Sequence, residues 1–92
     1  MTKQSKTGTW WVYFLRCNDN SLYAGVTTDI LRRIGEHNNS KLGAKYTRAR
    51  RPVTLAYLEG ADNKSEACKK EYLIRHLSKT KKELLVREYS HK

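Results

Sequence analysis

The residues of this sequence that could do chemistry fall in two neighbouring stretches. YAGVTTDILRRIGEHN (23–38) holds a tyrosine, two adjacent arginines and a histidine. The basic run that follows, KLGAKYTRARR (41–51), surrounds Tyr46 with five cations: Lys41, Lys45, Arg48, Arg50 and Arg51. Arginine and tyrosine together suit phosphate contact and base stacking, which predicts a nucleic-acid interface in this run. A solvated run of charge is the competing interpretation and is about equally common.

The charge of the whole chain favours the nucleic-acid interpretation. Its 92 residues include 19 Lys and Arg against nine Asp and Glu, for a net charge of +10. Each phosphate that a cation neutralises releases counterions, so a small protein this basic usually binds a polyanion. Charge that serves only solubility is the alternative. A membrane partner is not expected, because the sequence has no basic amphipathic helix with Trp or Phe on its apolar face.

Length and composition predict one domain in the cytoplasm. No apolar run reaches membrane-spanning length, and the first nine residues, MTKQSKTGT, lack the apolar segment of a signal peptide. We expect residues 1–9 to form a flexible tail ahead of a single domain over 10–88. Cys17 and Cys68 stand far apart without a CxxC pair, which argues against a zinc site and against a cytosolic disulfide.

The order of the elements predicts a small α+β domain. Strands are expected over 10–17, 21–26 and 53–60, and helices from the cap residues 27–29 to about 38, from about 65 to 77 and from 80 to about 88. The turn residues 18–20 join the first two strands as a hairpin, and 39–52 is expected to be a loop. The result is a three-stranded antiparallel sheet flanked by helices, in the order β-β-α-β-α-α.

Helical geometry separates the two adjacent arginines. With Ile30 in a buried stripe, a rotation of about 100° per residue places Leu31 in the same stripe. Arg33 and His37 then flank the stripe as an i,i+4 pair, whereas Arg32 points to water. Arg33 would thus be held in a fixed direction beside the sheet. On geometry alone, a solvent-directed head group with its stem over apolar surface is equally compatible.

The register of the hairpin decides whether the two tyrosines meet. An odd-numbered turn over 18–20 pairs Tyr13 with Gly25 and Leu15 with Tyr23, which brings both hydroxyls to one face. An even-numbered turn puts them on opposite faces, and the sequence allows either. Gly25 would leave room for the backbone of a ligand. Strand tyrosines are more often packing residues with a wet hydroxyl, so the pair alone does not make a site.

Taken in order, these motifs resemble the GIY-YIG nuclease domain. That family has two tyrosine motifs on a hairpin, an arginine ten residues past the second tyrosine and often a histidine four beyond it. VYF (12–14), YAG (23–25), Arg33 and His37 stand at that spacing here. The family's glutamate lies on a later helix, as Glu71 does in SEACKKEYLIRHL. The segment KYTR, over 45–48, is similar to that of small, stand-alone, largely uncharacterised bacterial members.

The resemblance implies a metal-dependent endonuclease that acts on DNA in repair or recombination, structure-selective or weakly specific. Tyr13 or Tyr23 would accept a proton from the attacking water, while Arg33 would clamp the phosphate and stabilise the phenolate. His37 would orient the phosphate or assist proton movement. Glu71 would hold Mg²⁺ or Mn²⁺. DNA is favoured over RNA, and either a protein partner or the structure of the nucleic acid would supply specificity.

Two departures from the family pattern are visible. The isoleucines of its name are replaced by Phe14 and Ala24, at positions that serve packing. The family also commonly carries an asparagine after its glutamate, but no asparagine follows Asn63 here, and Ser78 or Thr80 offers only a weaker polar group. A catalytically weak or inactive nucleic-acid-binding module on the same scaffold is therefore the alternative function, and a small basic RNA-associated protein is a third.

Glu71 by itself allows two interpretations. It lies at the edge of the side of its helix that we expect to be buried, with Leu73 and Ile74 within that side. A carboxylate there suits either a metal ligand or an ion pair with Arg75 at i+4. Lys70 falls inside the expected apolar stripe, where it would have to extend its ammonium group to solvent.

Overall fold

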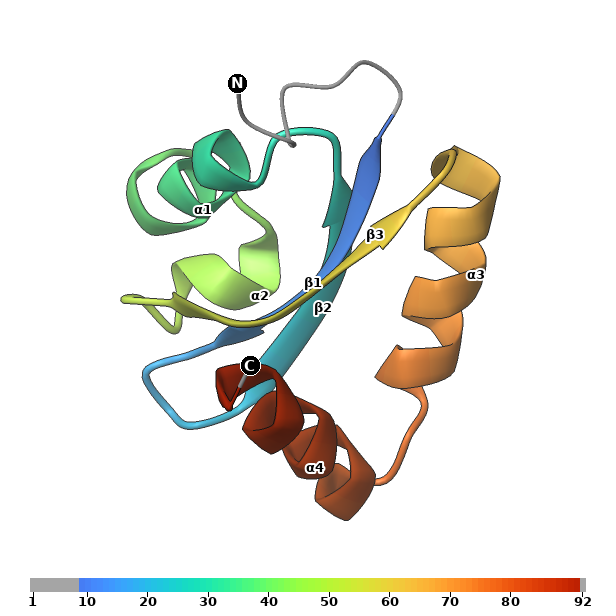
Figure 1. The fold of residues 1–92 in the computed structure, drawn as a ribbon. Coiled ribbons are helices and arrows are strands. Elements are labelled where there is room, and N and C mark those ends of the chain that lie inside the picture. Colours follow the sequence, from blue (N-terminus) through green and yellow to red (C-terminus); the bar gives the residue numbers. More distant parts are fainter. Residues whose placement is uncertain (1–8, 92) are drawn as a thin grey trace.

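Stretches rich in aromatic and β-branched residues form the sheet of this protein, which the computed structural model describes over residues 9–91. The strands are β1 (Trp10–Arg16), β2 (Leu22–Thr27) and β3 (Thr54–Ala61), antiparallel in the order β2-β1-β3 (Figure 1). The helices are α1 (Ile30–Asn39), α2 (Lys45–Arg48), α3 (Lys64–Arg75) and α4 (Lys79–Ser90). Apart from Thr9, the tail expected over 1–9 lies outside the described residues.

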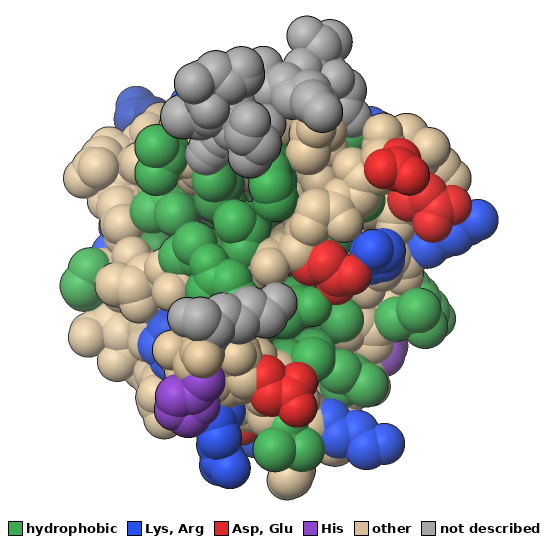
Figure 2. All heavy atoms as spheres, in the orientation of Figure 1, with side chains coloured by type: hydrophobic (Ala, Val, Ile, Leu, Met, Phe, Trp, Pro, Cys, Tyr) green, Lys and Arg blue, Asp and Glu red, His purple; other side chains and the backbone are tan. Residues whose placement is uncertain are grey.

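Alternation along the central strand gives the sheet two separate cores. Val12 and Phe14 point to the face that α3 and α4 cover, whereas Tyr13 and Leu15 point to the opposite face, under α1. All four side chains are at most 1% exposed. The helices therefore lie in two layers, with α1 and α2 on one side of the sheet and α3 and α4 on the other (Figure 1). Figure 2 shows the surface of the molecule in the same orientation, with hydrophobic side chains gathered in the middle, between the two layers of helices.

The hairpin has the odd-numbered turn. The backbone N–H of Cys17 donates to the carbonyl of Ser21 at 2.8 Å, and Tyr13 stands opposite Gly25. Tyr23 stands opposite Leu15 on the same face. Of the two arrangements that the sequence allows, the structure therefore has the one with both tyrosines on the same face, toward α1.

Polar side chains begin each of the three long helices. Asp29 accepts from the N–H of Arg32 at 3.1 Å, and Asn63 and Ser78 play the same part for α3 and α4. The predicted helices are therefore present, each within a few residues of its expected bounds. The loop expected over 39–52 is wrong for residues 45–48, which form α2. A helix of four residues is too short to leave a periodic apolar pattern in the sequence.

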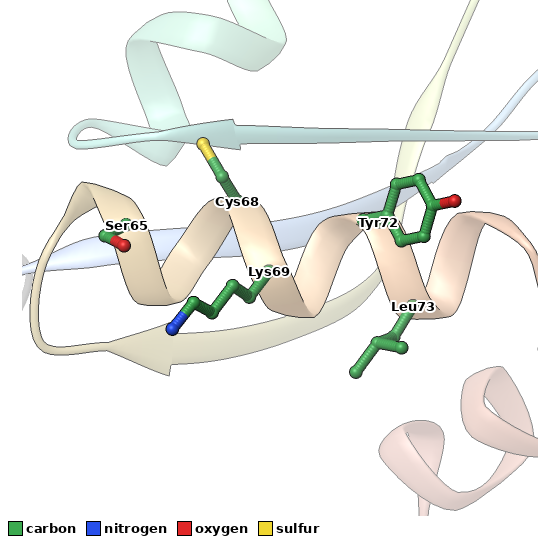
Figure 3. Close-up of a pocket in the computed structure, with 5 residues that line it drawn as sticks. All are labelled: Ser65, Cys68, Lys69, Tyr72 and Leu73. Atoms are coloured by element: carbon green, nitrogen blue, oxygen red, sulfur yellow. The ribbon is translucent and has the colours of Figure 1, made fainter.

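Two leucines expected in the core lie on the surface instead. Leu31 is 73% exposed and Leu73 is 65% exposed. Each helix rests on the sheet along one narrow line, and a residue one position off that line is rotated by about 100° into solvent. Figure 3 shows Leu73 and Tyr72 on α3, where they help to line a surface pocket of about 590 Å³. Lys70 also differs from expectation, because its ammonium group pairs with Glu59 at 2.8 Å.

Candidate active site

Tyr13 and His37 form a buried hydrogen-bonded pair between β1 and the last turn of α1. The Tyr13 hydroxyl lies 3.0 Å from Nε2 of His37, and the two residues are 1% and 0% exposed. His37 was expected only at the edge of the buried stripe. It lies fully inside because Tyr13 supplies the partner that a buried imidazole needs.

Gly25 provides the space that the Tyr13 ring occupies. A Cβ atom at position 25 would lie 2.6 Å from Cζ of Tyr13, closer than any real contact allows. The sequence interpretation, in which Gly25 admits the backbone of a ligand, is therefore corrected: the approach is made by the protein's own tyrosine. The glycine of the YAG motif lets Tyr13 extend across the hairpin toward Tyr23.

A third buried polar residue completes this cluster. Oγ1 of Thr47 lies 2.8 Å from Nδ1 of His37 and 2.9 Å from the carbonyl oxygen of Ala44, and Thr47 is 0% exposed. The sequence analysis did not select Thr47. The available signal was its place inside KYTR, but a threonine among three cationic and aromatic neighbours does not stand out as a buried residue.

Arg33 is held beside the sheet, as helical geometry predicted. Its Nη1 donates to Oε1 of Glu36 at 2.7 Å and to the carbonyl of Leu42 at 2.8 Å. Arg32 donates to the other oxygen of Glu36 at 2.6 Å from the solvent side. The side chain of Arg33 is 24% exposed, against 53% for Arg32. Sequence reasoning missed Glu36, which fixes both arginines at once.

Burial and charge act in opposite directions on the Tyr13 hydroxyl. Burial, the larger effect, raises the pKa of Tyr13 to about 12, while a hydrogen bond and the positive charge from Arg33 lower it. The same burial, together with the charge of Arg33, lowers the pKa of His37 to about 4. At neutral pH the pair is therefore a neutral phenol next to a neutral imidazole.

Tyr23 lies nearer the surface, between His37 and Tyr46. Its ring stacks on Tyr46 with centroids 5.9 Å apart and meets His37 edge-on at 5.3 Å. The guanidinium of Arg50 covers Tyr46 at 3.8 Å and also pairs with Asp19 at 2.9 Å. Stacking and an ion pair thus connect Tyr23, α2 and the hairpin turn through Tyr46 and Arg50.

A groove along β2 brings the second tyrosine to the opposite layer of helices. It has a volume of about 350 Å³ and is lined by Tyr23, Ala24, Gly25, Val26, Glu71 and Arg75. Because β2 is an edge strand, Glu71 can approach around it from α3. The Glu71 carboxylate is 17% exposed and accepts from Nε of Arg75 at 2.7 Å. The predicted ion pair of Glu71 with Arg75 is therefore present, and Glu71 also lines the groove.

The ordered residues and the fold are shared with known proteins. The sequence profile described as the GIY-YIG catalytic domain matches residues 9–84. The chain belongs to the GIY-YIG family. The predicted resemblance is confirmed, and this is a family of nucleases that typically depend on a metal ion.

Small UPF0213 proteins are similar to this GIY-YIG chain. One from Desulfotalea psychrophila is 55% identical over 78 residues, covering 85% of this chain and 71% of that protein. Another, from Bacillus subtilis, is 45% identical over 83 residues, covering 90% and 83%. The solution NMR structure of a UPF0213 protein from Bacillus halodurans matches with a TM-score of 0.55 at 48% identity, over 86% of this chain and 83% of that one. That of a protein from E. faecalis gives 0.60 at 37% identity, over 91% and 88%. The predicted α+β fold is confirmed.

Glu71 is the carboxylate of this GIY-YIG domain that the sequence suggested as a ligand for a hard cation. Across residues 9–91 no group of three or more His, Cys, Asp or Glu side chains could hold a metal ion by itself. Mg²⁺ does not need such a cage, because it keeps several waters and is commonly bound through one or two carboxylates and phosphate oxygens. A single carboxylate facing a groove fits that requirement, provided that Arg75 gives up its pairing.

The five cations expected to bind nucleic acid divide into two groups. Arg51 caps α1, since its guanidinium donates to the carbonyls of Glu36, His37 and Ser40. Arg50 is held by Asp19, as described above. The other three have exposed side chains that make no hydrogen bond or ion pair with described residues: Lys41, Lys45 and Arg48. We therefore keep these three as the candidate phosphate contacts of the loop.

No helix within the described part of the chain is long and apolar enough to span a membrane.

The buried imidazole of this GIY-YIG domain should make its stability depend on pH. The unfolded chain takes up a proton at His37 below pH 6.5, whereas the folded protein does so only below about 4. The free energy of unfolding should therefore fall as the pH drops from 6.5 to 4, by about 3 kcal/mol in total from this group. Urea unfolding at pH 7.5 and 4.5 measures the loss.

His37→Gln is the matched variant for this measurement. It should be less stable than the wild type at pH 7.5, because Tyr13 and Thr47 lose an imidazole partner, but its stability should decline less toward pH 4.5. An equal decline in the two proteins would show that other groups cause the acid sensitivity.

Proposed function

We propose that this GIY-YIG domain is a metal-dependent endonuclease that hydrolyses phosphodiester bonds of DNA. The observation that carries the proposal is the groove along β2, where Tyr23 and Glu71 face the same space although they come from opposite sides of the sheet. Tyr13 lies directly behind Gly25 in the groove wall, within reach of Arg33. In this proposal a tyrosine accepts the proton, Glu71 holds the cation, and Arg33, which reaches Tyr13 from α1, binds the phosphate.

Accessibility favours Tyr23 as the tyrosine that meets the attacking water. Its ring lines the groove, whereas Tyr13 is 1% exposed and its hydroxyl is engaged by His37. In this proposal Tyr13 and His37 lie beneath the reacting groups and hold one proton in the hydrogen bond between them. A tyrosine can accept that proton only as a phenolate, which forms readily only where positive charge stabilises it, and Arg33 supplies such charge next to Tyr13.

Arg33 would hold the phosphate. Its two hydrogen bonds to Glu36 and to Leu42 both use Nη1, so the donors of the guanidinium that are not engaged by the Tyr13 hydroxyl are available to a phosphate oxygen. The ion pair with Glu36 also keeps the planar group in one orientation, which reduces the reorganisation needed when the substrate arrives. Glu71 would hold Mg²⁺ or Mn²⁺, and a bound cation supplies stabilisation of the negative charge that develops on the leaving oxygen.

The exposed cations of the loop, Lys41, Lys45 and Arg48, would contact the backbone of the nucleic acid. Phosphate contacts position a protein but carry no sequence information. We therefore propose that the structure of the DNA, or a protein partner, selects the site of cleavage in repair or recombination.

The decisive experiment is a cleavage assay on branched, nicked and single-stranded DNA, with the same structures in RNA as comparison. We expect cleavage of DNA with Mg²⁺ or Mn²⁺ and none with EDTA. The alternative, a nucleic-acid-binding module without turnover, is favoured by one observation: Ser78, a candidate replacement for the family's asparagine, is used to cap α4. Salt-dependent binding of these substrates without cleavage by any cation would establish that alternative.

A further inference from the structure

The one-turn helix α2 contacts both tyrosines of the proposed site. Thr47 reaches Tyr13 through the imidazole of His37, and Tyr46 stacks directly on Tyr23. Thr47 is fully buried, so its hydroxyl must be satisfied by protein groups. KYTR is also the one motif singled out in the sequence to which the proposed mechanism gives no part beyond a phosphate contact.

The hydroxyl of Thr47 has a single proton to donate. It lies 2.9 Å from the carbonyl oxygen of Ala44, which can only accept. When the proton is used there, Oγ1 can only accept from Nδ1 of His37, at 2.8 Å. Nδ1 then carries the proton of the neutral imidazole, and Nε2 is left as an acceptor for the Tyr13 hydroxyl at 3.0 Å.

The opposite tautomer explains the distances less well. It would let the N–H of Ala44 donate to Nδ1, but that contact is 3.4 Å long. It would also turn the Thr47 proton toward Nδ1, leaving two oxygen atoms 2.9 Å apart with no proton between them. The first tautomer makes all three short contacts into hydrogen bonds with a donor and an acceptor.

We infer that Thr47 is a positioning residue: it holds His37 in the tautomer with the proton on Nδ1, so that Nε2 accepts the proton of the Tyr13 hydroxyl. The lone pairs of the Tyr13 oxygen are then directed away from the imidazole, toward Arg33. The catalytic consequence of this inference rests on the proposed function, whereas the tautomer itself does not. The KYTR segment would therefore have two roles: Thr47 positions His37 in the interior, and Lys45 and Arg48 contact phosphate at the surface.

The tautomer can be measured directly in the wild-type protein. Long-range ¹H–¹⁵N correlation spectra at pH 7, where His37 is neutral, distinguish a protonated Nδ1 from a protonated Nε2. We expect the proton on Nδ1 of His37, and His91, whose side chain is exposed, serves as an internal reference for an imidazole in solvent. A proton on Nε2 of His37 in the wild type would overturn the inference, whatever the protein does to DNA.

Two variants test the role of the hydroxyl. Thr47→Val keeps the shape without the hydroxyl, and we expect a shift toward the other tautomer with a 10- to 100-fold slower cleavage, roughly the cost of losing the partner that orients a functional histidine. Thr47→Ser should restore the tautomer and most of the rate. A valine variant with the wild-type tautomer and rate would contradict the inference. If the valine variant does not fold, the wild-type spectrum and the serine variant still decide.

The failure of this inference can be told apart from the failure of the proposed function. A wild type that cleaves no substrate removes the nuclease proposal, while the spectra continue to test the part of Thr47. Conversely, cleavage that is indifferent to Thr47, with the proton on Nε2, leaves the nuclease proposal intact and removes only the positioning role.

Discussion

Replacing Arg33 by alanine should slow metal-dependent cleavage by about 100-fold or more, whereas the same change at Arg32 should leave the rate close to that of the wild type. Removing one preorganised charge donor to a reacting phosphate typically costs on the order of 100- to 1,000-fold. Arg33 is such a donor in the proposed mechanism, because its side chain is 24% exposed and held beside Tyr13. Arg32 is 53% exposed and points to solvent. Single-turnover cleavage of a branched DNA measures both variants.

The adjacent arginines are a matched pair, since both variants lose one positive charge and one ion pair with Glu36. Binding to DNA should therefore weaken equally and slightly in the two. Arg33→Lys separates charge from geometry, because it keeps the charge but loses the planar fork, and we expect it to remain impaired. Thermal melts must show that the Arg33 variants are folded, since the guanidinium also ties Leu42 to α1. Equal rates for the two alanine variants would remove Arg33 from the site.

Replacing Glu71 by glutamine should reduce cleavage by a similar factor, on the order of 100-fold at low Mg²⁺. Glutamine keeps the shape but lacks the charge that attracts a hard cation. Raising the Mg²⁺ concentration should recover part of the rate, because it refills a weakened site. The measurement is the rate of cleavage as a function of Mg²⁺ concentration, with the binding of DNA as a control that should not change.

Arg75 offers the complementary variant. In the structure it occupies the carboxylate of Glu71 at 2.7 Å, so it competes with a cation for that group. Arg75→Ala should therefore shift half-maximal cleavage to a lower Mg²⁺ concentration, opposite to the shift in Glu71→Gln. If Glu71→Gln cleaves like the wild type at every concentration, Glu71 serves only as the partner of Arg75.

The parts of the site that could be predicted are those governed by local periodicity. Strand alternation places Tyr13 and Tyr23 on one face if the turn is odd-numbered, which the sequence left open, and helical rotation alone separates Arg33 from Arg32. Leu31 was expected in the buried stripe but is exposed. The apolar pattern predicts which side of a helix is buried, but the number of residues buried on that side depends on how the helix packs on the sheet.

Residues whose role depends on distant partners could not be predicted. Thr47 is a polar residue among other polar residues, and its part follows from the approach of α2 to α1, which leaves no periodic signal. Glu36 was missed for no such reason, because it pairs with Arg32 and Arg33 at i,i+4 and i,i+3 within α1. The sequence indicated that Gly25 leaves free space, but it wrongly assigned that space to a ligand. Only the tertiary structure shows that the ring of Tyr13 occupies it. The position of Glu71 beside Tyr23 was available only through the family resemblance, since the two lie 48 residues apart in the sequence.

The anchoring of the loop over 40–53 bears on how the protein would meet its partner. Arg51 closes the end of α1, Asn38 forms paired hydrogen bonds with the backbone of Val53, and Gly43 packs against the backbone of α1 so closely that a Cβ atom would lie 2.6 Å from a carbonyl oxygen. The backbone that carries Lys41, Lys45 and Arg48 thus gives up its conformational entropy during folding, not during association. A preformed rim of this kind can associate with a phosphate backbone without first becoming ordered.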